Sequence, residues 1–136
     1  MKVAIVGTSI DLTENEERDV RQMIAVILQS RYQRSDLVIS GGAKGVDTIA
    51  VEIAKGLGMP TKIYPPEKPE KKYYFKRNSI IAKECDELHC ISIPYRKKKC
   101  YHHEEEQEHE KTAGCWTMRK AEELNKPCQL VVTVKR

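Results

Sequence analysis

Short, continuous apolar runs alternate along the chain with longer stretches in which apolar residues recur every three or four positions. Each short run is predicted to be a strand, because strands buried on both faces of a parallel sheet are apolar throughout. The predicted strands cover residues 3–6, 36–40, 61–64, 87–93 and 129–134. The periodic stretches are predicted to be helices and cover residues 13–32, 46–57, 73–83 and 116–124.

The alternation of strands and helices favours one architecture. Strands that alternate with helices of about 10–15 residues are typical of α/β folds with a parallel sheet. We therefore predict a Rossmann-like three-layer sandwich, with a mostly parallel sheet of about five strands and helices on both faces. Residues 94–113 form a polar insertion before the last helix, and a structureless loop of that length is either functional or mobile.

Two further predictions concern single residues. Thr13 and Glu16 have the spacing of a capping box, in which each side chain accepts a hydrogen bond from the other residue's backbone, so the first helix should begin beside them. Ile80 and Ile81 are both predicted to point into the core from the third helix.

Length and composition narrow the class of protein. The 136 residues suit one domain, which we expect to span residues 1–136. No apolar run approaches the roughly 20 residues that cross a bilayer, so no membrane partner is expected. The opening MKVAIVGTSI lacks the apolar segment and cleavage site of a secretory signal. We therefore expect a cytoplasmic protein.

Net charge and cysteine content indicate whether the protein binds nucleic acid or metal ions. The net charge of +4, from 24 basic and 20 acidic residues, is too small to indicate a nucleic-acid-binding protein by itself. The five cysteines are an odd number, and in a chain without an export signal they are expected to be free thiols or metal ligands. Cys85, Cys90 and Cys128 are predicted to be small buried hydrophobic residues.

Glycine-containing turns follow two of the predicted strands, at residues 7–9 and 41–45. Glycine lets backbone N–H groups approach a ligand, and the start of a following helix adds unpaired donors and a partial positive charge. At the carboxyl ends of parallel strands, such turns can form a phosphate site. Neither turn matches the P-loop or the G-x-G-x-x-G fingerprint, so tight turns without a ligand stay an alternative.

The segment Val38-Ile-Ser-Gly-Gly-Ala-Lys-Gly-Val-Asp47, with Gly58-Met-Pro60 after its helix, resembles the core signature of the SLOG superfamily. The resemblance continues at Lys76-Arg-Asn78 and at residues 112–121, and it spans the chain apart from 94–113. This superfamily of Rossmann-like proteins includes the YpsA-like group, the DNA-processing protein A family and the "lonely guy" phosphoribohydrolases. In them the equivalent turns line a pocket for nucleotides or nucleotide-derived ligands.

The resemblance implies a ligand pocket built from four segments of this chain. The second turn would hold phosphate or ribose, and the first turn, the third helix and the start of the fourth helix would form the walls. The implied ligand-binding residues are Gly7, Thr8, Ser9, Gly41, Gly42, Ala43, Gly45, Asp47, Arg77, Asn78, Gly114 and Thr117. The alternative for Arg77 is a solvated basic helix face that it shares with neighbouring lysines.

At the fourth helix the chain departs from the phosphoribohydrolases. Those enzymes carry Pro-Gly-Gly-x-Gly-Thr-x-x-Glu there, whereas this chain reads Lys111-Thr-Ala-Gly-Cys-Trp-Thr-Met-Arg119. The catalytic glutamate has no clear counterpart, and Arg119 or Glu122 would have to be argued from geometry. An N-glycosidic hydrolase and a binding or sensing protein therefore both stay open. Catalytic residues are unassigned, and no tightly bound organic cofactor is expected.

The polar insertion gathers histidines and cysteines. Cys100, His103, His109 and Cys115 have the spacing C-x2-H-x5-H-x5-C, and two cysteines with two histidines are a common zinc-binding set. His102 could replace His103. Zinc would order a loop with few apolar residues and would anchor it over the mouth of the implied pocket like a lid. The alternative is a charged loop whose histidines bind nothing.

Three functions are consistent with these features. The main hypothesis is a domain that binds a nucleotide-type small molecule, as a sensor or an enzyme, and that pairs as a homodimer. The second is a single-stranded nucleic-acid-binding module, with the basic run 96–99 and Tyr73, Tyr74 and Tyr95 as contacts. The third is a small zinc-stabilised interaction protein without a working pocket. In the plain alternative, the basic run and the acidic run 104–110 neutralise each other.

Overall fold

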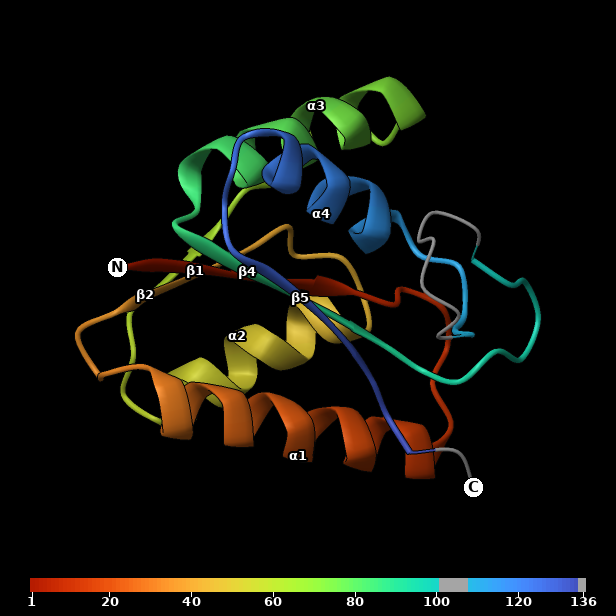
Figure 1. The fold of residues 1–136 in the computed structure, drawn as a ribbon, viewed down its shortest axis with the longest axis horizontal. Helices are drawn as coiled ribbons and strands as arrows, with labels where there is room; N and C mark the ends of the chain where they lie inside the picture. The colour runs from red at the N-terminus through yellow and green to blue at the C-terminus, as the bar shows by residue number, and fades with distance from the viewer. Residues whose placement is uncertain (101–107, 135–136) are drawn as a thin grey trace.

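The structure is a computed structural model that describes residues 1–100 and 108–134. Its strands are β1 (Lys2–Gly7), β2 (Leu37–Ser40), β3 (Thr61–Ile63), β4 (Glu87–Ser92) and β5 (Cys128–Val132). Its helices are α1 (Glu14–Arg31), α2 (Val46–Gly56), α3 (Lys71–Glu84) and α4 (Ala113–Glu123). The predicted order of elements and the predicted α/β fold class are confirmed (Figure 1).

The sheet has the strand order β3-β2-β1-β4-β5, and each neighbouring pair is parallel. All strands therefore end at the same edge. The chain moves outward from β1 to β3 and then returns to the other side of β1 to form β4. The segments that follow β1 and β4 consequently leave the sheet in opposite directions, which makes the edge between them the usual ligand crevice of open α/β sheets.

Helices cover both faces of the sheet. In Figure 1, α1 and α2 lie on one face and α3 and α4 lie on the other. Alternate residues of β1 enter the two cores: Val3 and Ile5 pack with α1 and α2, and Ala4 and Val6 pack with α3 and α4. Because both faces of the strand are packed, the position of β1 is fixed, and with it the position of the turn that follows. In the described part of the chain, no helix is both long and apolar enough to cross a membrane.

Polar caps set where two of the helices begin. The capping box is confirmed, because the Glu16 N–H donates to the Thr13 hydroxyl at 3.2 Å and the Thr13 N–H donates to the Glu16 carboxylate at 2.9 Å. Helix α4 begins at Ala113 rather than at the predicted Trp116, since the Thr112 hydroxyl accepts from the Gly114 N–H at 3.0 Å. Apolar spacing alone misses such a cap.

One core prediction on α3 is wrong. Ile81 is fully buried, whereas Ile80 is 40% exposed. Consecutive helical residues point about 100° apart, and α3 packs one side against the sheet and α4. Only one residue of the pair can therefore face the core.

Candidate functional site

The turns after β1 and β2 form one unit at the carboxyl edge of the sheet. The Ser40 hydroxyl donates to the Asp47 carbonyl oxygen at 3.1 Å and accepts from the Gly42 N–H at 3.2 Å. The Val46 N–H donates to the Thr8 carbonyl oxygen at 3.0 Å. The start of α2 is thereby tied to the end of β1.

Gly45 makes this junction possible. It has a φ of 83°, and a Cβ atom there would lie 2.3 Å from the Thr8 carbonyl oxygen. A side chain would therefore meet both backbone strain and a clash with the main chain of the neighbouring turn. The sequence places glycine where the two turns come closest.

A cavity of about 460 Å³ opens beside these turns, and we call it the turn pocket. The predicted ligand-binding positions that line it come from β1, the turns after β1 and β2, α2, α3 and α4. They are Gly7, Ser9, Gly41, Gly42, Ala43, Asp47, Arg77, Asn78, Gly114 and Thr117. The carboxyl edge of the sheet is therefore open at residues 41–43 rather than filled by side chains.

Two of the predicted ligand-binding residues do not line the turn pocket. Thr8 is fully buried, and its hydroxyl oxygen lies 3.1 Å from that of Ser92. Gly45 packs against Thr8. Both residues hold the turns together, and the ligand contacts of the other positions stay a prediction.

Sequence reasoning missed several lining residues, namely Val6, Lys44, Pro66, Tyr74 and Ala113. Tyr74 is the most informative of them, because its ring centroid lies 5.7 Å from the guanidinium carbon of Arg77. The two residues are three positions apart on α3, and this spacing places side chains on one helix face. The spacing could have identified Tyr74 once Arg77 was chosen.

Arg77 is held in place by its neighbours. Its Nε–H donates to the Asn78 side-chain oxygen at 2.7 Å, and its Nη1 donates to the carbonyl oxygens of Gly41 and Tyr64. The residue is 8% exposed, whereas Lys76 beside it is exposed. A solvated basic helix face therefore describes Lys76 but not Arg77, whose guanidinium is fixed at the wall of the pocket.

Asp47 places a carboxylate in the same pocket. Burial raises its pKa to about 6, although hydrogen bonds from the Ala43 and Gly41 N–H groups and the charge of Arg77 act in the opposite direction. The carboxylate is thus largely ionised at neutral pH, and it lies close to a fixed guanidinium. The pocket presents an anion and a cation side by side.

The sequence suggests that the backbone N–H groups of residues 41–43 are free to bind an anion, but in the structure they already have partners. The N–H groups of Gly41 and Ala43 donate to Asp47, and that of Gly42 donates to Ser40. Positive potential in the turn pocket therefore comes mainly from Arg77, from Lys44 and from the start of α2.

Helix α4 also begins at the turn pocket. The Thr112 hydroxyl donates to the Gly7 carbonyl oxygen at 2.6 Å while it caps the helix. A Cβ atom on Gly114 would lie 2.7 Å from the Gly7 nitrogen, so glycine allows α4 to touch the end of β1. The amino-terminal end of a second helix therefore adds its dipole to the site.

The connection from β4 to α4, residues 93–112, is folded where it is described. The Cys100 N–H donates to the His109 carbonyl oxygen at 3.0 Å, and the Lys111 N–H donates to the Lys98 carbonyl oxygen at 2.7 Å. The Glu110 carboxylate accepts from the N–H groups of residues 96–98. Burial opposes its ionisation, but these hydrogen bonds outweigh that effect and lower the pKa of Glu110.

Acidic groups pair with two of the four basic side chains of this connection. Lys99 pairs with Glu108 at 2.7 Å, and Arg96 pairs with Glu16 at 3.2 Å. Lys97 and Lys98 are exposed, so these contacts neutralise part of the basic run. Part of the acidic run, residues 104–107, lies outside the described residues.

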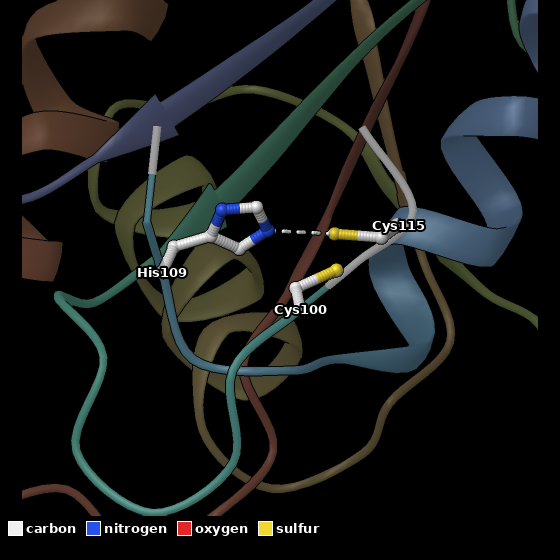
Figure 2. A group of neighbouring side chains, drawn as sticks. All are labelled: Cys100, His109 and Cys115. Atoms are coloured by element: carbon white, nitrogen blue, oxygen red, sulfur yellow. Dashed lines mark hydrogen bonds between the residues drawn. The ribbon is translucent and has the colours of Figure 1, made fainter. Parts of the chain in front are cut away.

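Cys100, His109 and Cys115 come together as predicted, and we call them the metal cluster. Their ligand atoms all lie within 4.8 Å of one another, and the His109 Nε2 lies 3.2 Å from the Cys115 Sγ. All three residues are buried. Figure 2 shows the side chains pointing toward one another, with Cys115 at the start of α4. The group could hold a metal ion. The predicted ligand His103 and its alternative His102 lie outside the described residues.

The remaining cysteines fit the prediction of buried hydrophobic residues in two cases out of three. Cys85 and Cys90 are fully buried, whereas Cys128 is half-buried. A hydrogen bond with Cys90 raises the pKa of the Cys115 thiol, and burial raises it further. Without a metal, Cys115 is therefore a thiol rather than a reactive thiolate.

No protein-family model matches the chain, and no curated protein sequence matches it. Its fold is similar to that of DNA processing protein A (DprA) from Streptococcus pneumoniae, with a TM-score of 0.66 and 20% sequence identity. The similarity covers 95% of this chain and 49% of that one, so this chain spans about half the length of the protein it matches. At this identity the likeness shows the fold.

Proposed function

We propose that this protein binds a nucleotide or nucleotide-derived ligand in the turn pocket, as a sensor or as an enzyme that acts on a nucleotide. The observation that carries the proposal is Arg77, an arginine fixed by main-chain carbonyls at the wall of an open cavity. A volume of about 460 Å³ lies within the range of small-molecule sites.

Phosphate binding would use the cationic side of the pocket. Guanidinium groups form strong, charge-assisted hydrogen bonds to phosphate, and Arg77 would use Nη2 for this, because its Nε and Nη1 donate to neighbouring protein oxygens. Two helices, α2 and α4, also begin at the cavity. Lys44 lies on the same wall and pairs with the exposed Asp11 at 3.0 Å. A phosphate would therefore compete with a weak, solvated ion pair.

Asp47 and Tyr74 would recognise the rest of the nucleotide. A carboxylate accepts hydrogen bonds from ribose hydroxyls, as acidic residues do in dinucleotide-binding folds. The Tyr74 ring is 39% exposed and borders the pocket, so a base could stack on it. The neighbouring cation and anion thus match the phosphate and the ribose, which are adjacent in a nucleotide.

The motif resemblance and the likeness to DNA processing protein A both support membership in the SLOG superfamily. We propose that residues 1–136 form one such domain and that it pairs as a homodimer. On α4, Arg119 and Glu122 are not among the residues that line the pocket. Of the described acidic residues, Asp47 is the one that lines it, which favours binding or sensing over N-glycoside hydrolysis.

A melting-temperature screen tests the main proposal. NAD, ADP-ribose and purine nucleotides are added to the full chain, and at least one is expected to raise the melting temperature in a saturable manner. Arg77→Lys should weaken that response, because a single ammonium cannot hold the protein contacts of Arg77 and also bind the ligand as a guanidinium does. The matched control Lys76→Ala removes an exposed neighbour and should respond like the wild type. The proposal fails if no ligand of the panel acts at millimolar concentration.

Single-stranded nucleic acid is the second candidate. A solved structure similar to this fold is named a DNA processing protein, and α3 exposes Lys71, Lys72, Lys76 and Tyr74. Oligonucleotide binding that weakens steeply with salt, and weakens further when these lysines are neutralised, would favour this function. Neutralising residues 96–99 should matter less, because Glu16 and Glu108 already pair with Arg96 and Lys99 of that run.

We also propose zinc as the metal of the cluster. Two thiolates and an imidazole are ligands that zinc prefers and that magnesium and calcium do not. Elemental analysis of protein purified without chelators should find about one zinc per chain. Less than about 0.2 zinc per chain would remove the proposal, because structural sites of this kind stay occupied through purification.

A further inference from the structure

The metal cluster and the turn pocket share one short segment, residues 112–115. Thr112 bonds to the end of β1, and Ala113 and Gly114 line the turn pocket. Cys115 follows directly and turns its sulfur to His109. These residues form the first turn of α4. A change in the position of Cys115 therefore also changes the position of Ala113 and Gly114 in the pocket wall.

The cluster joins three separate parts of the chain. Cys100 lies on one side of the β4–α4 connection, His109 lies on the returning side, and Cys115 lies in α4 (Figure 2). In a tetrahedral zinc site the ligand atoms lie about 3.5–3.8 Å apart. The observed atoms, all within 4.8 Å of one another, need only small movements to reach that geometry.

From this arrangement we infer that metal binding at Cys100, His109 and Cys115 regulates the turn pocket by fixing the start of α4. The inference rests on the proposed nucleotide site. The metal-bound form holds Ala113 and Gly114 in place as pocket wall, whereas the metal-free form leaves the first turn of α4 held by Thr112 and the contact with Gly7. Ligand and metal then bind with positive coupling.

Coupling of this kind is reciprocal, which makes it measurable from both sides. Removal of zinc should weaken ADP-ribose binding at least about fivefold, the lower end of usual coupling effects. Saturating ADP-ribose should strengthen zinc binding by the same factor. A local structural role of zinc, confined to the β4–α4 connection, would change neither affinity.

The test is calorimetric titration of the full chain with ADP-ribose, once zinc-loaded and once freed of zinc by a chelator that is then removed. Cys100→Ser should behave like the zinc-free wild type in both preparations, since it removes a ligand that does not line the pocket. The matched control Cys128→Ser removes a half-buried thiol on β5 and should retain the full zinc effect.

Equal ADP-ribose affinity with and without zinc would overturn the inference and leave the nucleotide proposal standing. Fresh protein with no zinc, or with a Cys100–Cys115 disulfide found by mass spectrometry, would also overturn it. So would global unfolding of the zinc-free chain in circular dichroism, because the coupling would then be folding itself. Zinc binding without ADP-ribose binding in either form would instead contradict the proposed function for this ligand, and the coupling with it.

Discussion

The turn pocket and the β4–α4 connection meet at α4, but different forces hold them. The turns after β1 and β2 are fixed by main-chain hydrogen bonds, by the close approach of Gly45 to Thr8 and by two aliphatic cores beneath them. The described part of the connection has main-chain hydrogen bonds of its own, and it also uses the Glu110 carboxylate and the side chains of the metal cluster. The first region can therefore keep its shape alone, whereas the second needs particular side chains and, we propose, an ion.

The two regions contribute to the site in different ways. A glycine-rich turn between buried strands is a rigid wall whose shape follows from the backbone. A polar connection gains order from a few strong contacts, so that its loss need not unfold the sheet. The turn pocket is lined by the glycine turns and by the start of α4, which directly follows this connection, so it can combine a fixed half with an adjustable half.

The largest loss of stability is expected when Gly45, in the rigid half, is substituted. Gly45→Ala should destabilise the protein by about 4 kcal/mol, because strain at positive φ and a main-chain clash act together. Gly56→Ala is the matched control: a Cβ there meets no atom within 4 Å, and the change should be neutral or stabilising by up to ~1 kcal/mol. Urea denaturation measures both. Equal stability of the two variants would contradict a rigid junction.

Removal of the metal should destabilise the adjustable half and lower the melting temperature of the protein. A ligand at 100–1000 times its dissociation constant stabilises a protein by about 3–4 kcal/mol, so chelation should lower the melting temperature by roughly 10 °C. The far-UV circular dichroism of the sheet and helices should largely persist below that temperature. Cys100→Ser should melt at the lower temperature with or without chelator, and a response to chelator in that variant would point to another metal site.

Asp47 belongs to the rigid half, and its titration should make the stability of the protein depend on pH. The carboxyl pKa is raised from 3.8 to about 6 in the folded protein, so the folded chain binds the proton more tightly than the unfolded chain. This contribution to stability is present at low pH and is lost as the pH rises through about 6. Relative to Asp47→Asn, the wild type should gain about 1 kcal/mol between pH 7.5 and pH 5. Parallel pH profiles in urea denaturation would rule out the buried carboxylate described here.

The smallest effect on stability is expected at Lys44. Its ion pair with Asp11 is exposed on both sides, so Lys44→Ala should change the unfolding free energy by less than about 0.5 kcal/mol. Nucleotide affinity should nevertheless fall several-fold, because Lys44 lines the pocket. Unchanged affinity in a calorimetric titration would place the phosphate away from this wall.

The sequence predicts the rigid half better than the adjustable one. Buried strands, the Thr13 capping box and the glycine turns have short-range patterns, and the structure contains each of them. The partners of Arg77, by contrast, are the carbonyl oxygens of Gly41 and Tyr64, which are distant in sequence. No periodicity identifies such contacts.

Contacts between distant residues also account for the features of the site that the sequence does not predict. Thr8 sits in a glycine turn but faces Ser92, because the register of β1 and β4 places those residues at the same level. The turn amides are partly used by Asp47, which the sequence shows only as an acidic residue in a first helical turn. The residue types of Cys100, His109 and Cys115 were enough to predict a metal cluster. Their burial depends on how α4 packs, which the sequence does not show.

Amide NMR can show, residue by residue, whether a nucleotide binds at the carboxyl edge of the sheet. On titration with ADP-ribose, the amide signals of Gly41, Gly42 and Gly114 should shift in a saturable manner, since these residues line the turn pocket. The signal of Gly58, which precedes β3 at the opposite edge of the sheet, should stay in place. Shifts that gather around Gly58, or none at millimolar ligand, would contradict the account.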